Sequence, residues 1–135
     1  MISLDTNVIL SALNPRDSNH HKAQALLDQH SLQAFCICPV VHTELRASVV
    51  WSALRAWLKL QGVTVIWEMP EVIWDNAGIA YGEYAVQRRS GVLPRRLVAD
   101  FLIAAHAAHH GLEVLTFDDT VFKAVFQDVA LLPLT

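Results

Sequence analysis

Several features that define other classes of protein are scarce or missing in this sequence. Its 135 residues include only two cysteines, too few for a disulfide-stabilised scaffold. Polar or charged residues interrupt every apolar stretch well before the ~20 residues that are needed to cross a bilayer. Residues 1–5 contain no basic segment ahead of a long apolar one. We therefore expect no secretion signal, no membrane association and a cytoplasmic protein.

Motifs for nucleotide cofactors and for serine chemistry are also missing. The chain has no glycine-rich phosphate-binding loop of the mononucleotide or the dinucleotide type. It has no Gly-x-Ser-x-Gly turn that would expose a nucleophilic serine. These absences argue against the use of a nucleoside triphosphate or a dinucleotide, and against a serine hydrolase.

The composition is that of an ordinary globular domain. Apolar residues make up 53% of the chain and charged residues 17%, which excludes a disordered protein. The length suits one domain, and no linker, repeat or low-complexity tract divides the chain. We therefore expect residues 1–135 to form a single domain.

The charges are unevenly distributed. The formal net charge of −3 excludes nucleic-acid binding by bulk positive charge. Within the chain, however, an acid-poor segment gathers four arginines, Arg88, Arg89, Arg95 and Arg96. They would suit RNA phosphates, which arginine binds through charge-assisted hydrogen bonds, or an acidic segment of a partner protein. The alternative is a solubilising loop around Gly91 and Pro94, and the sequence leaves both interpretations open.

Apolar periodicity and turn residues predict strands that alternate with helices. The predicted strands span residues 2–4, 34–38, 63–67, 114–116 and 129–132. The predicted helices span residues 7–13, 18–30, 40–60, 71–90, 96–110 and 120–125. This alternation is typical of a parallel sheet with helices on both faces, so we expect an α/β fold, a three-layer α/β/α sandwich around a central, mostly parallel sheet.

The two cysteines favour a core role over a metal role. Cys36 and Cys38 lie two residues apart in a predicted strand, which predicts that both side chains lie on one buried face. A zinc site would need a second pair of ligands, and beyond the nearby His42 no fourth ligand stands out.

Two acidic positions directly follow predicted buried strands. Asp5 follows the first strand, and Asp118 and Asp119 follow residues 114–116. Ligands of open parallel sheets bind beyond the carboxyl ends of the strands, so these positions suit a binding site. Taken one at a time, each aspartate is better explained as the N-cap of the next helix.

Two further acids are harder to explain as caps. Glu44 lies near the start of a predicted helix, and Asp100 is the only charged residue between Arg96 and Glu113. The helix dipole favours an anion about one turn from the helix start, which offsets part of the cost of burying Asp100.

A divalent cation would explain all four acids together. If they met in one place, they would raise each other's pKa values and would be stable as anions only beside a cation. Clustered carboxylate oxygens favour a hard ion, Mg²⁺ or Mn²⁺. Such an ion activates water for phosphodiester hydrolysis and offsets charge on the phosphorus centre.

Four segments carry a resemblance to a known family. They are residues 4–8 (LDTNV), 43–45 (TEL), 100–105 (DFLIAA) and 111–118 (GLEVLTFD). In order and spacing they resemble the PIN-domain ribonucleases, and among them the VapC-type toxins of bacterial toxin–antitoxin pairs. The resemblance extends over almost the whole chain. It implies a Mg²⁺-dependent endoribonuclease that hydrolyses RNA, is often a homodimer and is held inactive by a cognate antitoxin protein.

The resemblance also implies roles for individual residues. Its catalytic metal ligands correspond to Asp5, Glu44, Asp100 and Asp118, and its supporting side chains to Thr6, Asn7 and Thr116. Asp119 departs from the pattern, because a basic residue often stands there, and Phe122 comes one position late. Asp118 is therefore preferred as the fourth ligand, with Asp119 as its substitute or as a neighbour of the site.

Two other functions use the same acids. In an acidic-pocket phosphatase or phosphoacceptor domain, Asp5 would be the nucleophile, but the expected second aspartate is replaced by Asn7, which cannot act as an acid or base. In a catalytically inactive PIN-like module, the acidic pocket would serve only to bind a partner.

Overall fold

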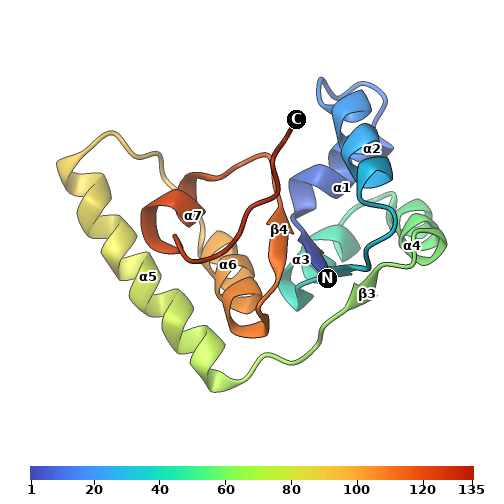
Figure 1. Cartoon of the computed structure of the whole chain (residues 1–135). Coiled ribbons are helices and arrows are strands. Elements are labelled where there is room, and N and C mark those ends of the chain that lie inside the picture. Colours follow the sequence, from blue (N-terminus) through green and yellow to red (C-terminus); the bar gives the residue numbers. More distant parts are fainter.

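Four short parallel strands form the centre of the molecule (Figure 1). The computed structural model describes residues 1–135, and the strands are β1 (Ile2–Leu4), β2 (Phe35–Ile37), β3 (Thr64–Val65) and β4 (Glu113–Leu115). Their order in the sheet is β3-β2-β1-β4, and every pairing is parallel. The carboxyl ends of β1 and β4 are therefore neighbours, although more than 100 residues separate them in the sequence.

Seven helices cover the two faces of this sheet. They are α1 (Thr6–Leu13), α2 (His20–Gln29), α3 (Pro39–Arg46), α4 (Trp51–Leu60), α5 (Glu71–Ser90), α6 (Val98–His110) and α7 (Thr120–Val125). One buried cluster packs α1 to α4 against side chains such as Ile2 and Ile37. A second packs α5, α6 and α7 against Cys36 and Val114. The helices lie on either side of β4 in Figure 1, which confirms the predicted three-layer α/β/α sandwich with a parallel sheet.

The prediction of one helix over residues 40–60 is wrong. The chain forms α3 and α4, with a turn between them in which the backbone N–H groups of Val50 and Trp51 donate to the side-chain and main-chain oxygens of Ser48. Val49, an apolar residue that lies one helical turn after Leu45, is fully exposed instead of buried. Serine competes for backbone hydrogen bonds in this way, and no glycine or proline marks the break.

Most other boundaries agree with the sequence to within a few residues. The structure has α5 and α7 where they were predicted, whereas α2 begins only at His20 and α6 at Val98. The strand predicted over 63–67 is reduced to β3. The last predicted strand is a single parallel bridge between Val114 and Leu131.

Both cysteines are buried and free, as expected for core residues. The prediction that they share a face is wrong, because Cys36 packs in the α5–α7 cluster and Cys38 in the α1–α4 cluster. Cys38 lies one residue beyond β2, where the alternation of a strand no longer applies. Burial raises the pKa of each thiol to about 11, which makes both poor nucleophiles. No helix combines the length and apolar character that crossing a bilayer requires.

Candidate active site

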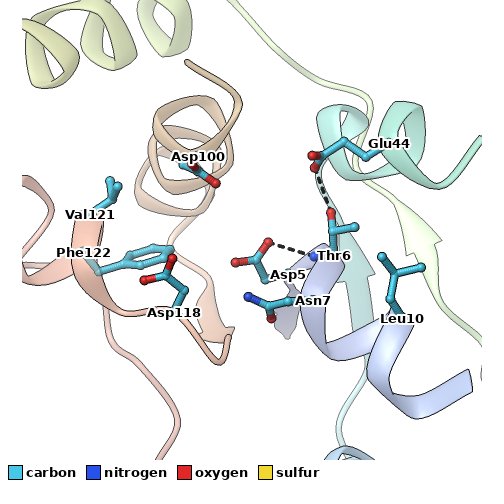
Figure 2. Close-up of a pocket in the computed structure, with 9 residues that line it drawn as sticks. All are labelled: Asp5, Thr6, Asn7, Leu10, Glu44, Asp100, Asp118, Val121 and Phe122. Carbon is cyan, nitrogen blue, oxygen red and sulfur yellow. Dashed lines mark hydrogen bonds between the residues drawn. The ribbon is translucent and has the colours of Figure 1, made fainter. Parts of the chain in front are cut away.

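The four predicted carboxylates line one pocket, although they come from four separate parts of the chain. Asp5 follows β1, Glu44 lies in α3, Asp100 lies in the first turn of α6, and Asp118 lies between β4 and α7. Figure 2 shows their side chains around a common opening. The pocket has a volume of about 240 Å³, and its other lining residues are Thr6, Asn7, Leu10, Val121 and Phe122.

Asp5 links the sheet to the pocket. Its backbone N–H donates to Leu115 O at 3.0 Å, which extends the pairing of β1 with β4. One carboxylate oxygen, Oδ1, accepts a hydrogen bond from the backbone N–H of Thr6 at 2.8 Å and caps α1. The other, Oδ2, accepts from the Thr116 hydroxyl at 2.7 Å. The N-cap role and the position in the pocket are therefore compatible in the same residue.

The predicted supporting residues hold this arrangement together. The Asn7 side chain donates from Nδ2 to Thr116 Oγ1 at 3.4 Å and accepts at Oδ1 from the Phe117 backbone N–H at 3.2 Å. The backbone N–H of Asp118 donates to the same Thr116 oxygen at 3.0 Å. Asn7 and Thr116 thus connect the start of α1 to the loop after β4.

Glu44 and Asp100 enter the pocket from helices on opposite faces of the sheet. Glu44 is exposed, and its Oε1 accepts a hydrogen bond from the Thr6 hydroxyl at 2.8 Å (Figure 2). Asp100 is half-buried and caps its own helix, because Oδ2 accepts from the backbone N–H of Leu97 at 3.2 Å. Burial, reinforced by the nearby charge of Asp118, raises the pKa of Asp100 above its usual range.

Asp118 is the only one of the four acids that has a cationic partner. Its Oδ2 lies 2.9 Å from Arg96 Nε. Burial opposes ionisation of Asp118, but the hydrogen bonds from Thr120 and the ion pair with Arg96 outweigh burial and lower its pKa. Asp119 does not line the pocket, since it is exposed and pairs with Lys123 at 2.8 Å. The structure therefore brings Asp118 into the cluster and leaves Asp119 outside it.

On the opposite side of the pocket, no cation offsets the negative charge of Asp5. Burial raises the pKa of Asp5 to about 6, and the negative charges of Asp100 and Glu44 add to the rise. The hydrogen bonds from Thr116 and Thr6 only partly oppose it. We call Asp5 with Glu44 the Asp5 side of the pocket, and Asp118 with Arg96 the Asp118 side.

The chemistry of the pocket fits a hard divalent cation. All four acids offer oxygen donors, and the Asp5 side carries negative charge that no protein cation neutralises. As the side chains lie, no three His, Cys, Asp or Glu residues are arranged to hold one ion. Binding of an ion would therefore have to draw the carboxylates closer together.

The arginine cluster does not act as one unit. Arg96 reaches the pocket through Asp118. Arg88 and Arg89 are exposed in the last turn of α5, and Arg95 is exposed in the loop that follows. None of these three forms a salt bridge.

Sequence reasoning missed the apolar part of the pocket and the ion pair within it. Leu10 lies one turn after Asn7 on α1, a spacing that places both on one face of the helix. Val121 and Phe122 lie in the first turn of α7, only a few residues after Asp118, and also line the pocket. No local signal links Arg96 to Asp118, because the pair is made across the fold.

Comparisons with known proteins identify the family of this arrangement. The model of the PIN domain family matches residues 2–126. No curated protein sequence matches the chain. Similar solved structures include FitAcB from Neisseria gonorrhoeae, at 24% identity and a TM-score of 0.69 over 99% of this chain and 98% of that one. VapBC-1 from nontypeable Haemophilus influenzae is 20% identical with a TM-score of 0.66, over 99% of this chain and 98% of that one.

A third similar structure is VapC20 from Mycobacterium tuberculosis, described as a Sarcin-Ricin loop cleaving toxin. It is 19% identical with a TM-score of 0.62, over 92% of this chain and 95% of that one. At these identities the three structures show a shared fold.

Proposed function

The chain belongs to the PIN domain family, and from this premise we propose that it is a metal-dependent endoribonuclease that acts as the toxin of a toxin–antitoxin pair. The observation that carries the proposal is the convergence of Asp5, Glu44, Asp100 and Asp118 on one pocket from four separate elements. A structural role alone does not explain it, because burial and neighbouring anions raise the pKa of Asp5 to about 6.

The residues of the pocket have distinct parts in this proposal. Asp5, Glu44 and Asp100 would hold the ion, and Asp118 completes the set of four acids. When bound, Mg²⁺, or Mn²⁺ in its place, lowers the pKa of a water molecule and offsets charge on the phosphate. Thr6 orients both Asp5 and Glu44, through its backbone N–H and its hydroxyl respectively. Thr116 and Asn7 fix the position of Asp5 relative to the loop that carries Asp118.

RNA is the proposed substrate, because the clustered carboxylates could hold an ion that activates water for phosphodiester hydrolysis, and the family implies a nuclease. The VapC20 toxin, which shares this fold, is described as cleaving the Sarcin-Ricin loop. Arg96 pairs with one of the carboxylates, and Arg88, Arg89 and Arg95 are exposed and free to meet phosphates farther along a strand.

The proposed protein partner is an antitoxin, because a similar solved structure from Klebsiella pneumoniae is described as a toxin–antitoxin complex. An apolar cavity of about 520 Å³ adjoins the carboxylate pocket and shares Leu10 with it; Leu13, Val50 and Leu54 also line it. This combination suits an amphipathic segment that lays apolar side chains beside Leu10 and brings a basic side chain to the acids. Co-purification of the chain with such a protein, and inhibition of cleavage by it, would support this assignment.

We also propose that residues 1–135 act as one nuclease domain, in the cytoplasm, and as a homodimer. Val72, Ile79 and Val86 recur every seventh residue on α5, and all three are exposed. Such a row of apolar side chains suits burial against a second copy. Light scattering should report a dimer, and a charge at Ile79 should convert it to a monomer.

The nuclease activity is tested with purified protein, an RNA substrate and added Mg²⁺. Cleavage should stop with EDTA, return with excess Mg²⁺, and be absent in Asp5→Asn. Asp119→Asn is the matched control, since Asp119 lies outside the pocket and should leave cleavage intact. Cleavage that persists in EDTA or in Asp5→Asn contradicts the proposal.

The alternatives lead to different results in the same assay. A phosphoacceptor would label on Asp5 with a phosphodonor, but Asn7 is engaged with Thr116 and Phe117 and offers no proton for that chemistry. An inactive module would bind Mg²⁺ or a partner without cleaving any RNA.

A further inference from the structure

Only one protein cation pairs with a carboxylate of the pocket, and it is the guanidinium of Arg96. Arg96 Nε lies 2.9 Å from Asp118 Oδ2, and the charge of Arg96 also acts on Asp100. The only other salt bridge of the chain, Lys123 with Asp119, lies outside the pocket. One protein cation therefore serves the Asp118 side, and none serves the Asp5 side.

Arg96 is held in place by the fold. Its Nη1 donates to Arg95 O at 2.9 Å and its Nη2 to Thr120 Oγ1 at 3.4 Å. Its side chain is 25% exposed, compared with 74% for Lys123 in the surface pair. A guanidinium fixed in this way still has N–H groups that can donate to one more acceptor, such as a phosphate oxygen.

Both carboxylate oxygens of Asp118 already have partners within the protein. Its Oδ2 pairs with Arg96, and its Oδ1 accepts from the backbone N–H of Thr120 at 3.1 Å. The oxygens of Asp5, by contrast, accept only from neutral groups. A divalent ion at Asp118 would be repelled by the adjacent guanidinium, whereas an ion at Asp5 would meet anions and neutral donors alone.

We propose that Arg96 takes the place of a second metal ion. The pocket holds one divalent ion, on the Asp5 side, and the guanidinium supplies the other positive charge beside the RNA phosphate. In nucleases with two metals, the second ion does this by stabilising one of the oxygens of the displacement. This inference rests on the proposed function and sharpens it, since Asp118 becomes a positioning residue for Arg96 and is not a ligand of the ion.

The test counts bound ions, independently of activity. Mn²⁺ is titrated into purified protein, and free Mn²⁺ is measured by electron paramagnetic resonance. The wild-type chain should bind one Mn²⁺. Arg96→Gln removes the charge, releases Asp118 and should raise the number to two, whereas Arg96→Lys keeps the charge and should bind one. Circular dichroism checks that each variant is folded.

Asp118→Asn provides a second measurement that does not depend on the folding of Arg96→Gln. A positioning role predicts undiminished Mn²⁺ affinity together with reduced RNA cleavage. A ligand role predicts a loss of affinity of roughly 10-fold or more, which would overturn the inference.

The outcomes separate this inference from the proposed function. Two Mn²⁺ per wild-type chain, together with metal-dependent RNA cleavage, overturn the role of Arg96 and leave the nuclease intact. One Mn²⁺ in folded Arg96→Gln also overturns it. A wild-type chain that neither binds Mn²⁺ nor cleaves RNA overturns both.

Discussion

The two sides of the carboxylate pocket deal with the same electrostatic problem in different ways. On the Asp118 side, a protein cation and hydrogen bonds from Thr120 stabilise the anion and lower its pKa. On the Asp5 side, only neutral donors are present, and burial raises the pKa to about 6. The fold thus neutralises the carboxylate on one side of the pocket by itself and leaves the carboxylates on the other side without a cation.

The largest effect on this difference between the two sides is expected when the charge of Asp5 is removed. Asp5→Asn should weaken Mg²⁺ binding by at least about 100-fold, the upper end of the loss seen for residues that only support a metal ligand. The protein should remain folded, because asparagine caps a helix as well as aspartate does. Isothermal titration calorimetry measures the affinity, with Asp119→Asn as the control. Equal affinity in Asp5→Asn and the control would place the ion elsewhere.

A smaller effect is expected when the neutral support of the Asp5 side is weakened. Thr6→Val removes the hydroxyl that donates to Glu44 at 2.8 Å but keeps the backbone N–H that bonds to Asp5. The affinity for Mg²⁺ should fall roughly 10-fold, as is typical for the loss of an orienting group. Thr6→Ser keeps the hydroxyl and should restore binding. A Ser variant as weak as the Val variant would contradict the role of the hydroxyl hydrogen bond, because serine keeps that hydroxyl.

The two sides should also respond to pH with opposite signs. The pKa of Asp5 is raised from 3.8 to about 6, so its neutral form favours the folded state. Without metal, stability is highest below pH 4 for this group, and on the order of 3 kcal/mol is lost as the pH rises through 6. The pKa of Asp118 is lowered, so its contribution is present at neutral pH and is lost as the pH falls.

Unfolding by urea as a function of pH, for the wild type and for Asp5→Asn, isolates the contribution of Asp5. The difference between the two free energies of unfolding should grow between pH 4 and pH 7 in EDTA and shrink when Mg²⁺ is saturating. A difference that does not vary with pH would contradict the raised pKa.

The smallest effect is expected outside the pocket. Lys123→Ala breaks the exposed pair with Asp119, and exposed pairs contribute only about 0–1 kcal/mol to stability. RNA cleavage and Mg²⁺ affinity should be unchanged within error. A clear loss of either would extend the functional site to Asp119, contrary to the pocket that the structure defines.

The sequence predicted the fold well where one rule governed each segment. The strand at residues 2–4 and the helix at 71–90 have an apolar pattern and clear boundaries, and both form as predicted. The break between α3 and α4 was missed, because Ser48 ends one helix through local hydrogen bonds that do not alter the apolar pattern. The cysteines were assigned to one face because the end of β2 was placed one residue too late.

The sequence predicted which acids line the candidate site, but it did not predict which of them pairs with a cation. Asp5 and Asp118 follow buried strands, so parallel topology alone brings them to one edge of the sheet. Which carboxylate receives a cation depends on side-chain contacts across the fold. Arg96 meets Asp118 only because the loop before α6 packs beside the loop after β4.

Asp5 both caps α1 and contributes a carboxylate to the pocket, and a single substitution can separate these two roles. Its carboxylate begins α1 through a bond that an amide oxygen makes equally well. Under the proposed function, an aspartate-to-asparagine copy would therefore be inactive while its exterior surface kept its shape. Such a copy would still bind the proposed antitoxin, and a cell that carried both copies would have less antitoxin available for the active one.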